Sequence, residues 1–115
     1  MKLNEFLTQL SQNPEQVDFS DTMAVIEENY TFTPSSFVNG GTVNEANQNN
    51  GSCKIFAFGL LNNLSAEQTL ACFGTYFRDD VLKNPEGDDH QNIRNFMSSA
   101  WGGIEMSGQP LVFKK

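Results

Sequence analysis

Residues 53–63 have the sequence CKIFAFGLLNN, and this stretch decides how the rest of the chain is arranged. Its large apolar side chains are Ile55, Phe56, Phe58, Leu60 and Leu61. They are too closely spaced for an element with one solvent-facing side. Ser52 lies directly before the stretch and is a favoured N-cap residue. We therefore predict a buried helix over residues 53–63, with a buried strand as the alternative.

Amphipathic helices are predicted before the central stretch. The first carries one apolar stripe made of Leu3, Phe6, Leu7 and Leu10. Asn13 and Pro14 end it and start the next, because Asn favours a cap and Pro suits the first helical position. Gln16 stands where a capping box places an amide. This second helix is predicted to run to about Asn29 and to bury Val17, Phe19, Met23 and Ile26.

Two more helices are predicted after the central stretch. Ser65 and Gln68 form a capping box, and a helical stripe follows as far as Pro85: Leu70, Phe73, Phe77 and Val81. The last helix opens at residues 88–91, and one face of it is marked by Ile93, Phe96, Met97, Ala100 and Trp101. We expect Gly102-Gly103 to end it, because glycine adopts the left-handed conformation that other residues resist.

Outside these helices, the apolar residues alternate with polar ones, as in short strands. Residues 30–33 alternate apolar and polar side chains, and residues 37–38 and 42–43 flank the turn Asn39-Gly40-Gly41. Residues 104–106 and 111–113 are two further strands around a turn at residues 108–110. The predicted fold class is α+β: one helix-rich domain over residues 1–115, with about four to five helices and a small, mostly antiparallel sheet.

The composition is that of an acidic globular domain. The chain has 115 residues, 38% of them hydrophobic, which suffices for one core without metal or disulfides. Its net charge of −7 leaves no basic surface for nucleic acid or anionic lipid, so neither is an expected partner. No apolar run is long enough to cross a bilayer. The sequence does not fix the oligomeric state.

The start of the chain and its cysteines indicate a cytosolic protein. The first residues enter a patterned helix directly, without the apolar segment of a secretory signal. Cys53 and Cys72 do not form a disulfide framework, and we predict that both are reduced thiols.

Residues 44–54, with the sequence NEANQNNGSCK, are the most unusual stretch. Side-chain amides run straight into a predicted helix start, where free N–H groups and the positive end of the helix dipole attract anions. Lys54 adds a positive charge. The candidate ligand-binding residues are therefore Asn49, Asn50, Ser52 and Lys54. The alternative is that the amides only satisfy loop backbone groups and cap the helix.

A second polar stretch opens the last predicted helix, and its candidate ligand-binding residues are His90, Asn92 and Arg94. If the two helix starts converge in space, they form a pocket for a small anionic ligand. For Arg94 the alternative is a structural ion pair with Asp79, Asp80 or Asp88.

Cys53 and His90 are the candidate catalytic residues. A thiol in the first turn of a helix has a lowered pKa, and a histidine nearby would complete a Cys-His pair for hydrolysis or acyl transfer. The alternative is a structural cysteine. Asp88, Asp89 and His90 are too weak a ligand pattern for a metal, so we predict no metal and no cofactor.

Several short sequence motifs of this chain recur together in one family. They are residues 21–26 (DTMAVI), Tyr30 with 32–34 (FTP), 49–54 (NNGSCK), 67–70 (EQTL), 73–74 (FG), 80–82 (DVL), 85–87 (PEG) and 90–97 (HQNIRNFM). In this order and spacing they resemble the HopJ type III effector family of small bacterial proteins. The resemblance covers nearly the whole chain. It brings no catalytic residues with it.

Three functions follow from these observations. The leading hypothesis is a non-catalytic binding or regulatory domain for a small anionic ligand or a protein partner, in the bacterial cytoplasm. The first alternative, implied by the resemblance, is an effector that a type III system delivers into a host cell, where it acts on a host protein. The second is a Cys-His hydrolase or transferase.

Overall fold

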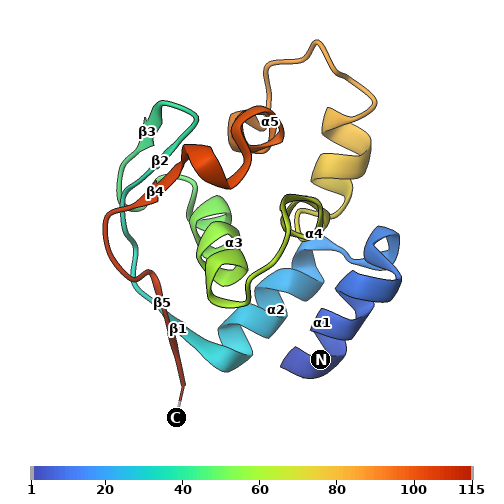
Figure 1. Cartoon of the computed structure of the whole chain (residues 1–115), viewed down its shortest axis with the longest axis vertical. Coiled ribbons are helices and arrows are strands. Elements are labelled where there is room, and N and C mark those ends of the chain that lie inside the picture. Colours follow the sequence, from blue (N-terminus) through green and yellow to red (C-terminus); the bar gives the residue numbers. More distant parts are fainter. Residues whose placement is uncertain (1, 115) are drawn as a thin grey trace.

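The central stretch forms a helix, α3 (Asn50–Leu61), which lies in the middle of the molecule (Figure 1). The computed structural model describes residues 2–114. In α3, residues 55–59 are consecutive and all buried. Consecutive helical side chains project in successive directions around the axis, so α3 has no solvent-facing side along this stretch. The predicted buried helix is confirmed, and the alternative of a strand is wrong.

The other helices pack around α3. They are α1 (Leu3–Gln12), α2 (Phe19–Asn29), α4 (Ala66–Ala71) and α5 (Gln91–Ser99). α2 and α4 both contact α3, and α4 also contacts α5 and α1. The predicted capping box of α4 is present, since Gln68 N–H donates to Ser65 Oγ (3.1 Å) and Ser65 N–H donates to Gln68 Oε1 (3.0 Å).

Short antiparallel strands complete the domain on the other side of α3 (Figure 1). β1 (Tyr30–Phe32) pairs with β5 (Leu111–Phe113). β2 (Phe37–Asn39) lies between β3 (Thr42–Asn44) and β4 (Ile104–Met106). The strands thus fall into two small sheets, and the predicted α+β fold is confirmed.

Phe56 of α3 is the meeting point of the core. Its ring lies 5.0 Å from that of Phe96, 5.8 Å from those of Phe37 and Phe73, and 6.4 Å from that of Trp101, measured between centroids. These partners come from β2, from the turn after α4, and from α5 and the 3-10 turn that follows it. Each such pair contributes about 0.5–1.5 kcal/mol beyond the burial of area. One side chain therefore joins both halves of the fold.

Two predicted helices are shorter than expected, because the chain breaks where two segments touch. Residues 14–16 form only a 3-10 turn, η1 (Pro14–Gln16), and α2 begins at Phe19, where the Asp21 carboxylate accepts a hydrogen bond from Asp18 N–H (3.2 Å). The helix expected up to Pro85 stops at Ala71 and resumes as a π-helical turn, η2 (Tyr76–Val81). Gly74 lies between them with a φ of +62°, and a Cβ there would come within 2.5 Å of the Phe19 nitrogen.

Two predicted helix ends also differ. α3 begins at Asn50 with Asn49 as its N-cap residue, so Ser52 lies inside the first turn and does not cap the helix. At the other end of the chain, Ala100 has the positive φ (51°) that ends α5, whereas Gly102 and Gly103 lie in a 3-10 turn, η3 (Ala100–Gly103), without positive φ. The expectation that these glycines end α5 was therefore wrong.

Gly59 permits a close packing contact that can be tested. A Cβ at this position would lie 2.7 Å from Trp101 Cη2 and 2.9 Å from Thr69 Oγ1. We expect Gly59→Ala to lower the free energy of unfolding by about 1–3 kcal/mol, because overpacking outweighs the better helix propensity of Ala. Urea unfolding followed by circular dichroism measures the change.

Gly102→Ala is the matched control, since no heavy atom lies within 4 Å of a Cβ there. Its free energy of unfolding should stay within about 0.5 kcal/mol of that of the wild type. Equal stability of both variants and the wild type would contradict the tight contact between α3 and the Trp101 ring.

Candidate ligand-binding pocket

The first turns of α3 and α5 open into one pocket with a volume of about 410 Å³. The residues that line it come from both helix starts, the β2–β3 hairpin, α2 and η2 with its preceding turn: Phe19, Thr42, Asn44, Asn49, Gly51, Ser52, Phe73, Tyr76, His90, Gln91, Asn92 and Ile93. The two polar stretches that the sequence singles out therefore meet in space. That the pocket binds a ligand stays a prediction.

A network of asparagine side chains holds the two helix starts together. Asn92 Nδ2 donates to Asn44 Oδ1 (3.0 Å), and Asn44 Nδ2 donates to Asn92 Oδ1 (3.3 Å). Asn49 Nδ2 donates to the same Asn44 oxygen (2.7 Å), and Asn39 Nδ2 donates to Asn92 Oδ1 (3.0 Å). Asn39, Asn44 and Asn92 are buried, so the bonds among these three form away from competing water and fix the geometry of the pocket.

The N-cap residues of α3 and α5 share an unusual backbone conformation. Asn49 has φ 54° and ψ 48°, and His90 has φ 50° and ψ 50°, both in the left-handed region. An N-cap residue normally lies in the β region, from which its side chain reaches back to its own helix. Here neither side chain does so. The left-handed conformation costs about 1–2 kcal/mol per residue, although Asn and His tolerate it better than most.

Backbone donors at both helix starts are consequently left open. The amide N–H groups of Gly51 and Ser52 on α3 donate to no acceptor within residues 2–114, and the same holds for Gln91 and Asn92 on α5. These residues all line the pocket. The first N–H groups of a helix lack intrahelical partners and carry the positive end of its dipole. Two such ends facing one hollow form a site that attracts an anion.

Aromatic rings form one wall of the pocket. The Phe19 and Tyr76 rings meet edge to face with centroids 5.0 Å apart, and the Tyr76 and His90 rings lie 5.1 Å apart at 35°. His90 Nε2 is 3.0 Å from Asp80 Oδ2 and 3.9 Å from Asp89 Oδ2. The histidine is thus held between the ring of Tyr76 and a carboxylate of η2.

Only part of the predicted set of site residues meets in the pocket. Asn49, Ser52, His90 and Asn92 line it. Asn50 lies in the first turn of α3 but does not line the pocket, and its buried Oδ1 has no partner within the described chain.

The two cations that the sequence placed in the site lie elsewhere. The Lys54 ammonium lies over the Phe32 ring, 4.9 Å from its centroid. Arg94 pairs with Asp89 through Nη2 and Oδ1 (2.6 Å) and donates to the carbonyl oxygens of Asp89 and Asn84. The hydrogen bond from Arg94 lowers the pKa of the Asp89 carboxyl. The alternative for Arg94, a structural ion pair, is therefore present, but its partner is Asp89 and none of Asp79, Asp80 and Asp88.

Sequence reasoning missed Phe19, Thr42 and Tyr76 as pocket residues. Phe19 has the pattern of a core residue, and Thr42 that of a strand. Tyr76 carried a usable signal, because it lies outside the apolar stripe of its segment between Phe73 and Phe77. A large aromatic side chain on the polar side of a helical pattern often contacts a ligand or a partner.

Cys53 does not line the pocket, although His90 does. Its side chain is fully buried, and Sγ donates to the Ser35 carbonyl oxygen at 3.6 Å. Burial raises the pKa of the Cys53 thiol, against the lowering expected at a helix start. His90 has Asp80 as its hydrogen-bond partner. Within residues 2–114 no three His, Cys, Asp or Glu side chains form a group that could hold a metal ion.

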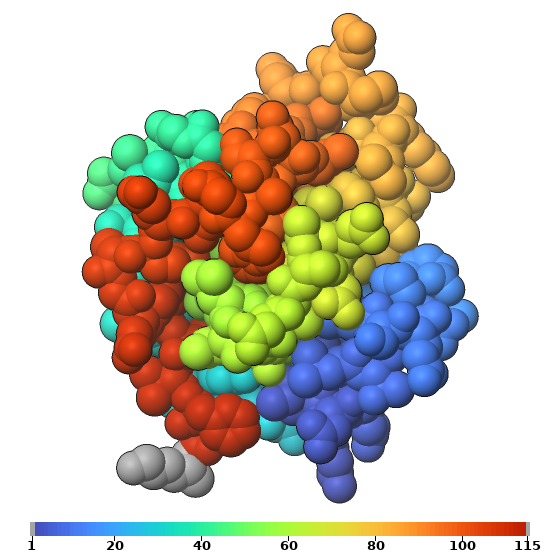
Figure 2. Space-filling view, viewed as in Figure 1, coloured from blue at the N-terminus to red at the C-terminus, as the bar shows by residue number. Residues whose placement is uncertain are grey.

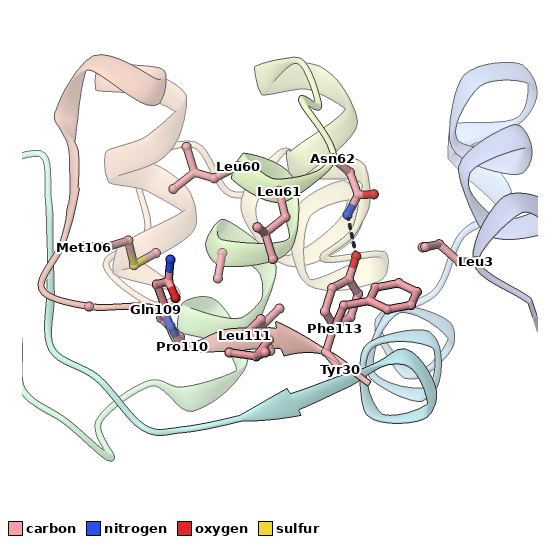
Figure 3. Close-up of a pocket in the computed structure, with 13 residues that line it drawn as sticks. Leu3, Tyr30, Leu60, Leu61, Asn62, Met106, Gln109, Pro110, Leu111 and Phe113 are labelled. Carbon is pink, nitrogen blue, oxygen red and sulfur yellow. Dashed lines mark hydrogen bonds between the residues drawn. The ribbon is translucent and has the colours of Figure 1, made fainter. Parts of the chain in front are cut away.

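A second hollow, the apolar groove, lies at the opposite end of α3. It has a volume of about 570 Å³ and lies between the end of α3 and β5 (Figure 3). Leu60, Leu61, Val112 and Phe113 line it, and each is about half exposed (48–56%). At its end, Asn62 Nδ2 donates to the Tyr30 hydroxyl (3.1 Å). Figure 2 shows the end of α3 at the surface between the C-terminal strands and α1.

The fold and the pocket define a small α+β domain with a polar hollow between two helix starts. The model of the HopJ type III effector protein family matches residues 3–111, so the chain belongs to that family. The chain is also similar to a crystal structure of VPA0580, a protein described as of unknown function, with 60% sequence identity and a TM-score of 0.98. That likeness covers 99% of this chain and 95% of the other. A comparison with curated proteins gave no match.

No helix within residues 2–114 combines the length and the apolar character that crossing a membrane requires.

Burial of the two thiols gives a testable expectation. Burial raises the pKa of Cys53, and it raises the pKa of Cys72 to about 12. Since the thiolate is the reactive form, neither cysteine of the folded protein should react with iodoacetamide at pH 8, whereas both should react in urea. Mass spectrometry of the alkylated protein checks this. Rapid alkylation of folded Cys53 would contradict its burial and revive the Cys-His hypothesis.

Proposed function

We propose that this chain is a binding domain for a small anion, which it holds between the first turns of α3 and α5. The observation that carries the proposal is the set of unpaired backbone N–H groups of Gly51, Ser52, Gln91 and Asn92 at one pocket. A bound anionic oxygen would give these donors partners and would meet the positive ends of two helix dipoles.

The charges around the pocket favour an anion of low charge. Among its described lining residues there is no Lys or Arg, because Lys54 and Arg94 have other partners. Asp80 lies behind His90, and the chain has a net charge of −7. These negative charges would repel a doubly charged phosphate, and the pocket offers only neutral N–H donors to offset that repulsion. A carboxylate carries one charge and is repelled less. The proposed ligand is therefore a small monoanion.

A binding role fits the site better than a catalytic one. The burial of the Cys53 thiol argues against Cys53 as the nucleophile of a Cys-His pair. The His90 imidazole is engaged with Asp80, and the asparagine network keeps Asn44 and Asn92 in mutual hydrogen bonds. These groups hold the shape of the pocket, which is what a binding or regulatory domain requires. The bacterial cytoplasm is the location that we propose.

Ser52→Asp is the variant that tests the anion site. The new carboxylate would lie at the positive end of α3, where it stabilises the helix by about 0.3–1 kcal/mol but repels a ligand of the same charge. Titration with acetate, followed by 1H–15N NMR, should give saturable shifts of the Gly51, Ser52, Gln91 and Asn92 amide signals in the wild type. In the variant the shifts of the corresponding signals should be lost.

The control is Ser52→Asn, which has a similar shape without the charge. It should bind acetate within about threefold of the wild type, since the change adds no charge. A wild-type protein whose pocket amides show no saturable shift would overturn the proposed function.

A protein partner is the second candidate function, and the apolar groove favours it. Four half-exposed apolar side chains, Leu60, Leu61, Val112 and Phe113, gather there. Exposed apolar patches of this kind mark interaction surfaces. A second copy of this chain would bring a net charge of −7 against −7, so we propose a different protein, less acidic than this one. In a type III effector of the HopJ family, that partner would be a host protein.

The groove proposal requires that the chain alone does not pair through this surface. We expect the wild type to sediment as a monomer in analytical ultracentrifugation at moderate salt. Leu61→Asp in the groove and Leu82→Asp, an equally exposed leucine outside it, should sediment alike. A wild-type dimer that Leu61→Asp dissociates and Leu82→Asp does not would show that a second copy covers the groove, against this proposal.

A further inference from the structure

The wall of the ligand pocket brings together rings from three separate elements. Phe19 belongs to α2, Tyr76 to η2, and His90 is the N-cap residue of α5. All three line the same hollow of about 410 Å³, which is in the size range of sites for small molecules, ~300–1,000 Å³. Tyr76 is the central ring: its centroid lies 5.0 Å from that of Phe19 and 5.1 Å from that of His90.

Tyr76 is unusual among these rings because it remains open. It is 41% exposed although it touches both Phe19 and His90. An aromatic side chain that is held on two sides and open toward a hollow offers an ordered apolar surface. Aromatic pairs prefer offset-stacked or edge-to-face arrangements, so a second flat ring is the group that gains most from this surface.

The ring wall and the open backbone donors are close enough for one small molecule to reach both. A Cβ at Gly51 would lie 2.9 Å from Phe19 Cζ, so the first turn of α3 lies directly against the Phe19 ring. Gly51 and Ser52 line the same pocket as Phe19 and Tyr76. A small molecule in that pocket can therefore contact both the ring wall and the first turn of α3.

We infer that the pocket takes a planar aromatic monocarboxylate. This inference rests on the anion site proposed above and adds the class of ligand. The ring lies against Tyr76 and Phe19, and the carboxylate oxygens accept hydrogen bonds from N–H groups at the starts of α3 and α5. The absence of Lys and Arg among the described lining residues selects a single negative charge over a phosphate.

A matched series of ligands tests the class on the wild-type protein. Benzoate, cyclohexanecarboxylate and phenyl phosphate differ in one property each: the first two share the carboxylate and size but not the flat ring, and the first and third share the ring but not the charge. The Gly51, Ser52, Gln91 and Asn92 amide signals follow each titration by 1H–15N NMR. We expect benzoate to bind about 3- to 10-fold more tightly than cyclohexanecarboxylate, as one aromatic contact allows, and more tightly than phenyl phosphate.

Variants of Tyr76 locate the ring. Tyr76→Phe keeps the aromatic face and should keep the preference for benzoate over cyclohexanecarboxylate. Tyr76→Leu removes the face and should abolish that preference while the amide shifts with either carboxylate remain. The NMR spectrum of each variant reports whether it is folded. If Tyr76→Leu does not fold, the ligand series on the wild type still tests the class of ligand.

The outcomes separate this inference from the proposed function. If cyclohexanecarboxylate binds as tightly as benzoate, the aromatic ligand class is wrong but the anion site stands. If phenyl phosphate binds more tightly than benzoate, the preference for a single charge is wrong as well, and only a general anion site remains. If none of the three, nor acetate, shifts the pocket amides, both proposals are overturned. If benzoate is preferred and Tyr76→Leu keeps the preference in full, the ring does not lie on Tyr76 and the inference fails.

Discussion

The structure depends on one constraint, which is that α3 has to be covered on every side. Residues 55–59 are consecutive, helical and buried, so packing α3 against a neighbour on one side only would leave some of these residues in water. The fold meets the demand with helices on one side and two small sheets on the other, and the Phe56 ring contacts members of both. Burying one large apolar side chain contributes roughly 1.5–3 kcal/mol to stability. Removing any one covering layer would therefore cost several kcal/mol of folding free energy.

The covering of α3 also creates the ligand pocket. Because α5 and the β2–β3 hairpin pack beside the start of α3, two helix N-termini point into the same hollow, and the asparagine network holds them there. Asn49 and His90 adopt a strained left-handed conformation and do not cap their own helices. Residues in strained backbone conformations cluster at functional sites, and this supports the proposed site. The open donors are thus a product of the fold itself.

Local patterns predicted the elements well and their boundaries less well. Crowded apolar residues after Ser52 indicated the buried α3, with a strand as the alternative, and the Asn39-Gly40-Gly41 turn indicated the hairpin. The breaks at residues 17–18 and at Gly74 arise where two distant segments touch, which no local spacing records. The sequence analysis left open whether the two polar helix starts meet in space, and in the fold they do meet.

Lys54 and Arg94 were placed in the site by their position in the sequence. Their actual partners, Phe32 and Asp89, are decided by tertiary packing and by side-chain reach.

The most direct test of the central claim is a crystal structure of the protein grown with saturating 4-bromobenzoate, in which the anomalous signal of bromine locates the ligand. We expect a bromine peak beside the Tyr76 ring, with the carboxylate within hydrogen-bond distance of backbone N–H groups at the starts of α3 and α5. A bromine peak confined to the apolar groove near Leu61 and Phe113, or an empty pocket under these conditions, would contradict it.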